Sequence, residues 1–210
     1  MRRKGILIVV SGFSGAGKGT LMKALLSRYE ENYALSISAT TRKPREGEVH
    51  GREYFFITKE EFEKKIAQEE LIEYAKYVEN YYGTPRDYVE KQLNAGKDVI
   101  LEIEIQGALK VKASFPETVL LFVTPPTSTE LKERLVGRGT ETIEIIESRM
   151  KRAAEEAEGM EQYDYLVVND NLERCVEEIH AVIRAEHCRS FRNIEFMKEI
   201  KEELGAKIVK

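Results

Sequence analysis

The sequence predicts an α/β fold in which helices cover both faces of a mostly parallel sheet. The run GILIVVSG at residues 5–12 is continuously apolar, as in a strand that is buried on both faces. It leads into a glycine-rich loop and then into a helical pattern that begins near Leu21. Helical patterns also follow three later strand candidates, which is typical of right-handed crossovers between parallel strands. These candidates are residues 98–107, 118–126 and 164–170.

Two segments differ from this alternation. Residues 38–97 are rich in Tyr, Arg and Glu, and the runs ALSISAT, EYFFIT and LIEYAKYVEN predict short strands around a helix at about 59–69. We expect an inserted subdomain there. Residues 127–158 are charged and mostly helical, with the breaker GRG at 137–139, which favours a mobile lid. The remaining residues, 1–37, 98–126 and 159–210, are expected to form the core, ending in one packing helix over about 172–204.

Length and composition narrow the class of protein. The 210 residues can build one sizeable core, and 42% hydrophobic with 33% charged residues is ordinary for a globular chain. The net charge of −4 gives no basis for general nucleic-acid binding. We expect neither a membrane span nor a signal peptide, because the apolar start runs directly into the glycine loop.

The cysteines and histidines predict no metal centre. Cys175 and Cys188 both fall in the expected C-terminal helix, about 20 Å apart, which is too far for a disulfide. We expect reduced, buried thiols and a cytoplasmic protein. The three histidines share no zinc-ligand spacing with each other or with the cysteines.

The stretch SGFSGAGKGT at residues 11–20 is typical of a phosphate-binding loop. Its glycines let backbone N–H groups converge on phosphate oxygens, and Lys18 adds a positive charge in front of a helix N-terminus. The strand before it and the helix after it are the context that this motif requires. The predicted contacts to a nucleoside triphosphate are Gly12, Phe13, Ser14, Gly15, Ala16, Gly17, Lys18, Gly19 and Thr20.

A second group of residues lies in SISATTRKPREGEVHGREY, residues 36–54. Arg42 and Arg45 stand around Pro44, which restricts the chain and could aim both guanidinium groups at one phosphate. Ser38, Glu48 and Tyr54 surround them. By itself this stretch is equally compatible with a solvated loop; the phosphate-binding loop upstream and ENYYGT downstream favour a binding site.

The complete set of motifs resembles guanylate kinases. SGxSGAGKGT, SATTRKPREGEVHGREYFF, NYYGT, LEIEIQGA, RLVGRGTE and YLVVND occur in the order and approximate spacing of that family, over nearly the whole chain. The resemblance implies the reaction of ATP and GMP to ADP and GDP with Mg²⁺. It also implies a P-loop core, a GMP-binding subdomain and a lid.

The resemblance also implies roles for individual residues. It implies that Arg42, Arg45, Tyr54 and Tyr82 hold the GMP phosphate. Two fixed cations and two phenol groups suit a phosphate dianion that must be held still for in-line attack. A carboxylate can accept from the N1–H and N2–H₂ edge of guanine, for which adenine offers no equivalent, so Glu73 is the expected specificity residue. The predicted GMP contacts are Ser38, Arg42, Arg45, Glu48, Tyr54, Glu73, Tyr82, Thr84 and Glu104.

Three arginines match those that close over the ATP phosphates in the family: Arg134, Arg138 and Arg149. Asn169 resembles the family's contact on the adenine side. The predicted catalytic residues are Lys18, Arg42, Arg138 and Arg149. No general acid or base is assigned, because the acceptor phosphate is already ionised near neutral pH.

Two departures from the family pattern concern the metal. Family members usually carry Ser or Thr at the place of Gly19, and D-I-D at the place of Glu102, Ile103 and Glu104. We expect both glutamates on one side of a strand, facing the cleft. Our hypothesis is that the longer Glu102 compensates for the missing hydroxyl at Gly19 by positioning Mg²⁺, directly or through water.

Three other interpretations compete with a guanylate kinase. A non-catalytic module of the same fold usually has a damaged phosphate loop, whereas Lys18 is intact here. A ribose-bisphosphate phosphokinase is disfavoured by Ser38, Glu73 and Thr84, and only the phosphate loop points to an adenylate kinase. We expect ATP and GMP as partners, with no nucleic acid, membrane or obligatory protein partner.

Overall fold

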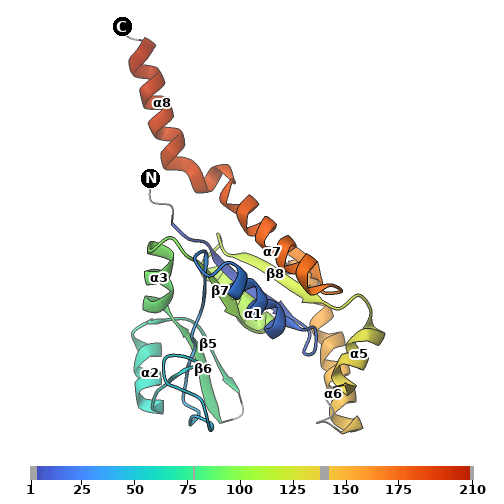
Figure 1. Ribbon diagram of the computed structural model, residues 1–210. Helices are drawn as coiled ribbons and strands as arrows, with labels where there is room; N and C mark the ends of the chain where they lie inside the picture. The colour runs from blue at the N-terminus through green and yellow to red at the C-terminus, as the bar shows by residue number, and fades with distance from the viewer. Residues whose placement is uncertain (1–3, 78, 138–141, 209–210) are drawn as a thin grey trace.

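The central sheet determines where the loops of this protein lie. The structure is a computed structural model that describes residues 4–77, 79–137 and 142–208. Five parallel strands follow the order β2-β7-β1-β8-β9, so β1 is central and the predicted parallel α/β fold is confirmed (Figure 1). The strands are β1 (Leu7–Gly12), β2 (Tyr33–Leu35), β7 (Asp98–Glu102), β8 (Val119–Thr124) and β9 (Tyr165–Val168).

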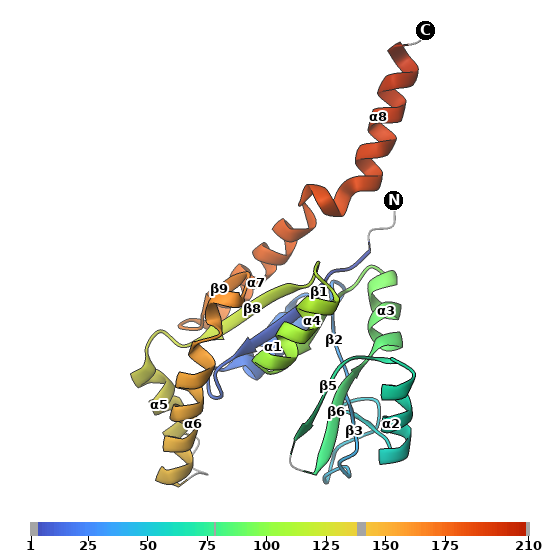
Figure 2. The ribbon, with the colours of Figure 1, turned by 180° about the vertical axis from the view of Figure 1, so that it is seen from behind.

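Helices cover both faces of this sheet, as the apolar run in β1 predicts. Ile8 and Val10 belong to the core beneath α1 (Lys18–Arg28) and α7 (Leu172–His187). Leu7 and Val9 belong to the core on the opposite face, beneath α3 (Arg86–Asn94) and α4 (Ile105–Ser114), which is seen in Figure 2. All four side chains are buried. Each such side chain contributes about 1.5–3 kcal/mol by leaving water.

A second, smaller sheet lies beside the first and has the strand order β4-β3-β6-β5. The helix α2 (Lys59–Ala67) begins at a capping box of Thr58 and Glu61, and its Phe62 is fully buried, stacked on Tyr81 with ring centres 5.2 Å apart. The expected strand in ALSISAT divides between the two sheets, since its first residues belong to β2. The strands are β3 (Ala39–Thr40), β4 (Phe55–Phe56), β5 (Leu71–Tyr77) and β6 (Asn80–Pro85).

Two helices form an arm on the other side of the central sheet (Figure 1). They are α5 (Ser128–Val136) and α6 (Ile143–Ala157), followed by the short 3₁₀ helix η1 (Met160–Gln162). The Thr127 hydroxyl caps α5 by accepting from the Glu130 N–H. Helices over 127–158 agree with the prediction, although residues 138–141 lie outside the described part of the chain.

The predicted strand over 98–107 is wrong in its second half. β7 ends at Glu102 and α4 begins at Ile105. Glu104 is the N-cap of α4, because its side chain accepts a hydrogen bond from the Gly107 N–H at 2.9 Å. The sequence pattern predicts Glu102 and Glu104 on one face of a single strand. This prediction is wrong, because only Glu102 belongs to the strand.

The predicted single helix over 172–204 is also wrong. α7 ends at His187, and the 3₁₀ helix η2 (Ser190–Asn193) separates it from α8 (Ile194–Ile208). The Asn193 side chain ends α7 by donating to the carbonyls of His187 and Arg189, each at 2.9 Å. α8 projects away from both sheets (Figures 1 and 2).

The cysteines differ from one another. Cys175 is buried in α7, as expected, whereas Cys188 lies at the end of that helix and is exposed, so the expectation of two buried thiols is wrong for Cys188. Both thiols are free. In the described ranges, no helix is both long and apolar enough to cross a bilayer.

Candidate active site

The glycine loop connects the carboxyl end of β1 to α1. Its glycines at 12, 15 and 17 have φ angles of 149°, 96° and 89°, in the region that favours glycine. At Gly12 there is also no room for a side chain, because a Cβ atom would lie 2.0 Å from the Val123 carbonyl oxygen. Phe13 anchors the loop in the core, edge-on to Phe122 with ring centres 5.0 Å apart. Ser14, Gly19 and Thr20 are exposed, so the loop opens toward solvent at these positions.

Lys18 reaches back over the loop. Its ammonium donates to the carbonyl of Gly12 at 2.6 Å and to that of Phe13 at 3.0 Å. It is also the first residue of α1, whose N-terminal N–H groups favour an anion. The loop therefore combines backbone donors, a helix terminus and one cation at a single end of the sheet.

Arg134 and Asn169 lie against the same loop. The Ala16 carbonyl accepts from Asn169 Nδ2 at 2.8 Å and from Arg134 Nη1 at 3.2 Å. Arg134 Nη2 also donates to the Asn169 carbonyl at 2.6 Å and pairs with Glu130 on its own helix. These two predicted ATP contacts thus bind the protein's own loop in this structure.

Arg42 and Glu48 form the centre of a second cationic group. Both Arg42 Nη atoms donate to the Glu48 carboxylate, at 2.9 and 2.8 Å, and Glu48 also accepts from the Arg45 backbone N–H at 2.7 Å. The Arg42 guanidinium lowers the pKa of Glu48 to about 2. The Glu48 carboxylate, followed by the Tyr82 hydroxyl, raises the pKa of Arg42.

Aromatic rings support the Arg42 guanidinium. Its carbon lies 5.4 Å from the Tyr54 ring centre and 5.7 Å from that of Phe56. The Tyr54 and Tyr82 rings lie 6.0 Å apart, so Arg42, Tyr54 and Tyr82 come together while the Arg45 side chain is exposed. Phe56 was missed from the sequence. Its position two residues after Tyr54, on the same side of an extended chain, is the signal that could have found it.

Glu73 and Thr84 meet on neighbouring strands of the second sheet. The fully buried Thr84 hydroxyl donates to the Glu73 carboxylate at 2.8 Å. Burial raises the pKa of Glu73, and the Glu104 carboxylate adds to this rise. Both carboxylates approach Gly107 at the start of α4, where a Cβ atom would lie 3.5 Å from Glu73 and 3.7 Å from Glu104. Glu73 and Glu104 are thus brought together across two elements.

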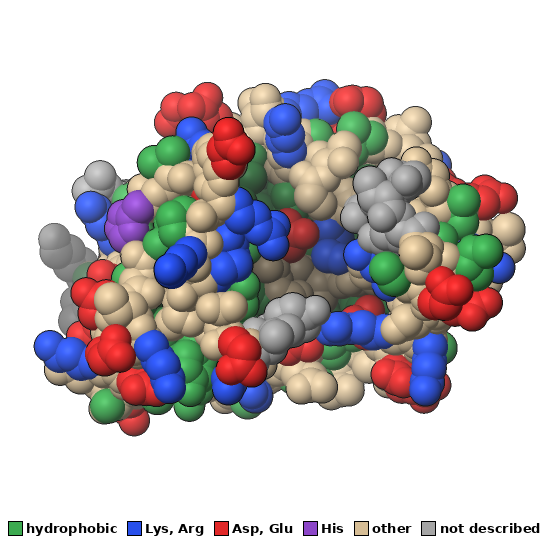
Figure 3. All heavy atoms as spheres, turned by 90° about the horizontal axis from the view of Figure 1, so that it is seen from below, with side chains coloured by type: hydrophobic (Ala, Val, Ile, Leu, Met, Phe, Trp, Pro, Cys, Tyr) green, Lys and Arg blue, Asp and Glu red, His purple; other side chains and the backbone are tan. Residues whose placement is uncertain are grey.

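A cleft joins the second sheet to the end of β7. The cleft has a volume of about 330 Å³, and we name it the acceptor cleft after the predicted GMP contacts among its lining residues. Figure 3 shows from below that the surface is hollowed between the second sheet and the α5–α6 arm, with Lys and Arg side chains on both sides of the hollow. The residues that line the acceptor cleft are Leu35, Ser36, Ser38, Glu53, Tyr54, Thr84, Leu101, Glu102 and Ile103.

Glu102 connects the acceptor cleft with the glycine loop. It pairs in register with Val10 of β1, two residues before Gly12. Burial raises the pKa of the Glu102 carboxyl, and the nearby Lys18 charge acts in the opposite direction. No group of three or more His, Cys, Asp or Glu side chains that could hold a metal occurs in the part of the chain that the structure describes.

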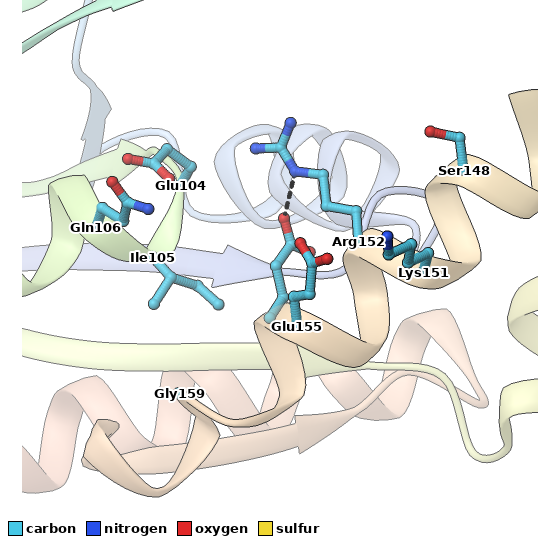
Figure 4. A pocket seen from close by; sticks show the side chains of 9 residues that line it. Glu104, Ile105, Gln106, Ser148, Lys151, Arg152, Glu155 and Gly159 are labelled. Atoms are coloured by element: carbon cyan, nitrogen blue, oxygen red, sulfur yellow. Dashed lines mark hydrogen bonds and ion pairs between the residues drawn. The ribbon is translucent and has the colours of Figure 1, made fainter.

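A second cleft, of about 560 Å³, separates α4 from α6. In Figure 4, Glu104 and Gln106 lie on one side, and Ser148, Lys151 and Arg152 on the other; the dashed line is the 3.0 Å bond from Arg152 to Glu156. Gln106 lies within the motif LEIEIQGA but is not among the predicted site residues, and the quoted motifs do not include Lys151 or Arg152. Arg149 lies on α6, and Arg138 falls outside the described residues.

The glycine loop lies at the end of a parallel sheet, beside a second site of arginine, tyrosine and carboxylate groups. This arrangement defines a P-loop phosphotransferase that acts on two phosphate-bearing substrates. Comparison with known sequences gives the particular family. The sequence profile described as guanylate kinase matches residues 4–186. This chain belongs to the guanylate kinase family.

Individual relatives agree with this assignment. The guanylate kinase of Bacillus anthracis is 55% identical over 202 residues, which cover 96% of this chain and 98% of that one. The guanylate kinase of Bacillus subtilis strain 168 is 55% identical over 192 residues, covering 91% and 94%. The crystal structure of guanylate kinase from Anaplasma phagocytophilum superposes with a TM-score of 0.71 at 33% identity, over 91% of each chain.

Proposed function

We propose that the protein transfers the γ-phosphoryl group of ATP to GMP, and also to dGMP, giving ADP and the guanosine diphosphate for purine nucleotide metabolism. The observation that carries this proposal is the continuity of the two sites. The acceptor cleft is lined by Ser38, Tyr54 and Thr84 on one side and by Glu102 on the other. Glu102 lies beside β1, which leads directly into the ATP loop.

Residues 38–97 would bind GMP in this proposal. The Glu73 carboxylate would accept from the guanine N1–H and N2–H₂ groups, while Thr84 holds the carboxylate in place. Those two donors favour the ionised form of a carboxylate whose pKa is raised by burial. The GMP phosphate would be held by Arg42, Arg45, Tyr54 and Tyr82. The other proposed GMP contacts are Ser38, Glu48 and Glu104.

Phosphoryl transfer itself would depend on position and charge. Lys18 and the loop N–H groups would hold the β- and γ-phosphates, and Arg42 would hold the acceptor in line with them. Arg138 and Arg149, from the segment 127–158 that we propose as a lid, would stabilise the charge on the transferring group. The acceptor phosphate is already ionised, so no side chain has to remove a proton from it.

The residues present fit a magnesium ion that is bound mainly by substrate and water. Glu102 supplies one carboxylate beside Lys18, and Mg²⁺ commonly takes its other ligands from phosphate oxygens and water. Bound Mg²⁺ would neutralise charge on the β- and γ-phosphates. We keep the proposal that Glu102 compensates for Gly19. Mg²⁺ titrations monitored by calorimetry in Glu102→Asp, Gly19→Ser and the double variant would test it, and additive effects would disprove it.

The test of the proposed function is a panel of phosphate acceptors with MgATP. GMP and dGMP should be phosphorylated, whereas AMP, UMP and ribose bisphosphate should not. Turnover with ribose bisphosphate instead of GMP would identify the related phosphokinase, and no turnover with any acceptor would identify a non-catalytic module.

We also propose that the enzyme acts in the cytoplasm, which its free thiols support.

A further inference from the structure

We infer that Asn169 and Arg134 are positioning residues that fix the phosphate loop before ATP binds. Both hold the Ala16 carbonyl, and through it they set the direction of the Gly17 N–H. This inference rests on the proposed function in one respect, namely that the loop receives the phosphates of ATP. It differs from the roles implied by family resemblance, in which Arg134 meets the phosphates and Asn169 the adenine.

One peptide unit, between Ala16 and Gly17, is held from outside the loop. The Ala16 carbonyl accepts from Asn169 Nδ2 at 2.8 Å and Arg134 Nη1 at 3.2 Å. None of the described peptide bonds is cis, so the carbonyl of Ala16 and the N–H of Gly17 lie in one peptide plane and point in opposite directions. Holding the oxygen on the outer side of the loop therefore turns the Gly17 N–H toward the inner side, where backbone donors cradle phosphate.

Gly17 is fitted closely to Asn169. Its φ of 89° is left-handed, and a Cβ atom there would lie 2.5 Å from Asn169 Nδ2. The amide of Asn169 thus occupies the space that a side chain at position 17 would need. Gly17 is also the N-cap residue of α1, so the same contact fixes the start of the helix that supplies the anion-binding terminus.

The two donors are themselves fixed. Asn169 is 8% exposed, and its backbone N–H donates to the Thr124 carbonyl at 2.7 Å. Arg134 donates to the Asn169 carbonyl at 2.6 Å and pairs with Glu130. The loop is therefore held by α5 and by the end of β9, which are far from it in sequence. A donor set fixed in advance binds phosphate without first having to order the loop.

The two roles of Asn169 predict different ligand dependence. A contact to adenine would affect ligands that carry the base. A positioning role acts on the phosphate site, so it should affect inorganic tripolyphosphate as strongly as ATP. GMP binding should be unaffected in either case, because the acceptor cleft does not include Ala16, Arg134 or Asn169.

The experiment compares Asn169→Leu with Asn193→Leu. Both substitutions remove an amide of similar size that donates to backbone carbonyls, but Asn193 lies at the break between α7 and α8. Calorimetry should show that Asn169→Leu lowers the affinities for ATP and for tripolyphosphate by the same factor, about tenfold for one lost buried hydrogen bond. Asn193→Leu should leave both affinities unchanged. A loss for ATP alone would overturn the inference in favour of an adenine contact, and no loss for either ligand would also overturn it.

Arg134→Met provides an independent variant, since the Arg134 side chain is partly exposed and its replacement is better tolerated than one at the buried Asn169. It should also weaken tripolyphosphate binding. Because both residues hold one carbonyl, the double variant should lose less than the product of the two single effects, and independent effects would contradict a shared role. In both single variants the Gly17 amide resonance should shift in the ligand-free protein. A wild-type protein that binds tripolyphosphate but does not phosphorylate GMP would instead refute the proposed function.

Discussion

Two glutamates of the proposed GMP site show opposite pKa shifts for identifiable reasons. Glu48 lies in the fork of Arg42 and accepts a third hydrogen bond from the Arg45 backbone, so its pKa falls to about 2. Glu73 is partly buried beside Thr84 and near Glu104, so its pKa rises. At the scale of the residue, the Glu48 carboxylate is held ionised by partners in the protein, whereas the Glu73 carboxylate would gain its further donors from GMP in the proposed function.

Removing the Glu73 carboxylate should abolish the preference for guanine. We expect Glu73→Ala to lower kcat/KM for GMP about a hundredfold, because two hydrogen bonds to a charged acceptor are lost. ATP affinity should change little. Steady-state kinetics with GMP and AMP would measure both effects. The matched control is Glu70→Ala, which removes a nearby glutamate that pairs with Lys65 on the surface. A Glu73→Ala enzyme that keeps full preference for GMP would refute the assignment.

The Arg42–Glu48 pair should make stability depend on pH in the acid range. The pKa of Glu48 is about 2 in the folded protein, against an ordinary value of 4.5. Its contribution is therefore fully present above pH 4.5 and is lost as the pH falls through about 2. We expect the wild type to be more stable than Glu48→Gln at pH 7, with the difference shrinking toward pH 3. Urea unfolding at several pH values would measure it; a difference independent of pH would contradict the prediction.

At the scale of the element, Gly17 and Gly19 differ in whether the structure requires a glycine at their position. Gly17 needs its glycine for backbone angle and for space, because the Asn169 amide lies against it. Gly19 lies in the first turn of α1, and a Cβ atom there would have no neighbour within 4 Å among the described residues. Nothing in the packing of the described loop requires a glycine at position 19.

Alanine substitutions should separate these two glycines. Gly17→Ala should displace Asn169 and abolish ATP binding, because the new methyl group clashes and φ is strained. Gly19→Ala should bind ATP and raise stability by up to about 1 kcal/mol, the usual gain from removing a helical glycine. Thermal unfolding and calorimetry of the two variants would measure both outcomes. A Gly19→Ala protein that is less stable than the wild type would contradict the account of position 19.

Elements differ in how far the sequence predicts them. The buried strand β1 and the loop after it could be predicted, because the apolar run, the spacing of the glycines and the helical pattern that follows all indicate the same strand–loop–helix unit. The end of β7 could not, since Glu102 and Glu104 alternate like a strand and only the bond from Gly107 shows that Glu104 starts a helix. The helix α3 was missed, because Pro85 and the short amphipathic run behind it follow a segment that is typical of a strand.

The roles of Arg134 and Asn169 illustrate a different limit. Their positions are far apart in sequence, and motif alone assigns each to ATP. That both reach the Ala16 carbonyl depends on how α5 and β9 pack around the loop, which no local pattern contains. Arg42, Tyr54 and Tyr82, by contrast, come together, as the role that the family resemblance implies for them requires, and Phe56 adds a further contact.

At the scale of the whole molecule, Asp98 connects three distant parts of the chain. Its carboxylate accepts from the Ile6 N–H at 2.8 Å and lies 2.8 Å from His187 Nε2. The start of β7, the segment before β1 and the end of α7 therefore meet at one buried group. Both the Asp98 and the His187 side chains are about nine-tenths buried.

Replacing Asp98 should destabilise the fold without changing the chemistry. We expect Asp98→Asn to cost about 2 kcal/mol, because an amide keeps only one of the two acceptor oxygens and leaves a buried polar group without its hydrogen-bond partner. KM for ATP and GMP should stay unchanged at temperatures where the variant is folded. The exposed Asp87→Asn is the matched control and should be neutral. Urea unfolding would measure the difference, and a cost below about 1 kcal/mol would show that Asp98 does not organise this junction.

The unequal surroundings of the two thiols have a practical consequence. Burial raises the pKa of Cys175, whereas Cys188 is exposed where α7 ends, next to the projecting α8. A maleimide reagent at neutral pH should therefore modify the native protein at one position. The label would lie where α7 ends, at the foot of the projecting α8 in Figure 1, whereas the hollow in Figure 3 lies between the second sheet and the α5–α6 arm. The wild-type sequence thus provides an attachment point for single-molecule observation that leaves the glycine loop and the acceptor cleft open.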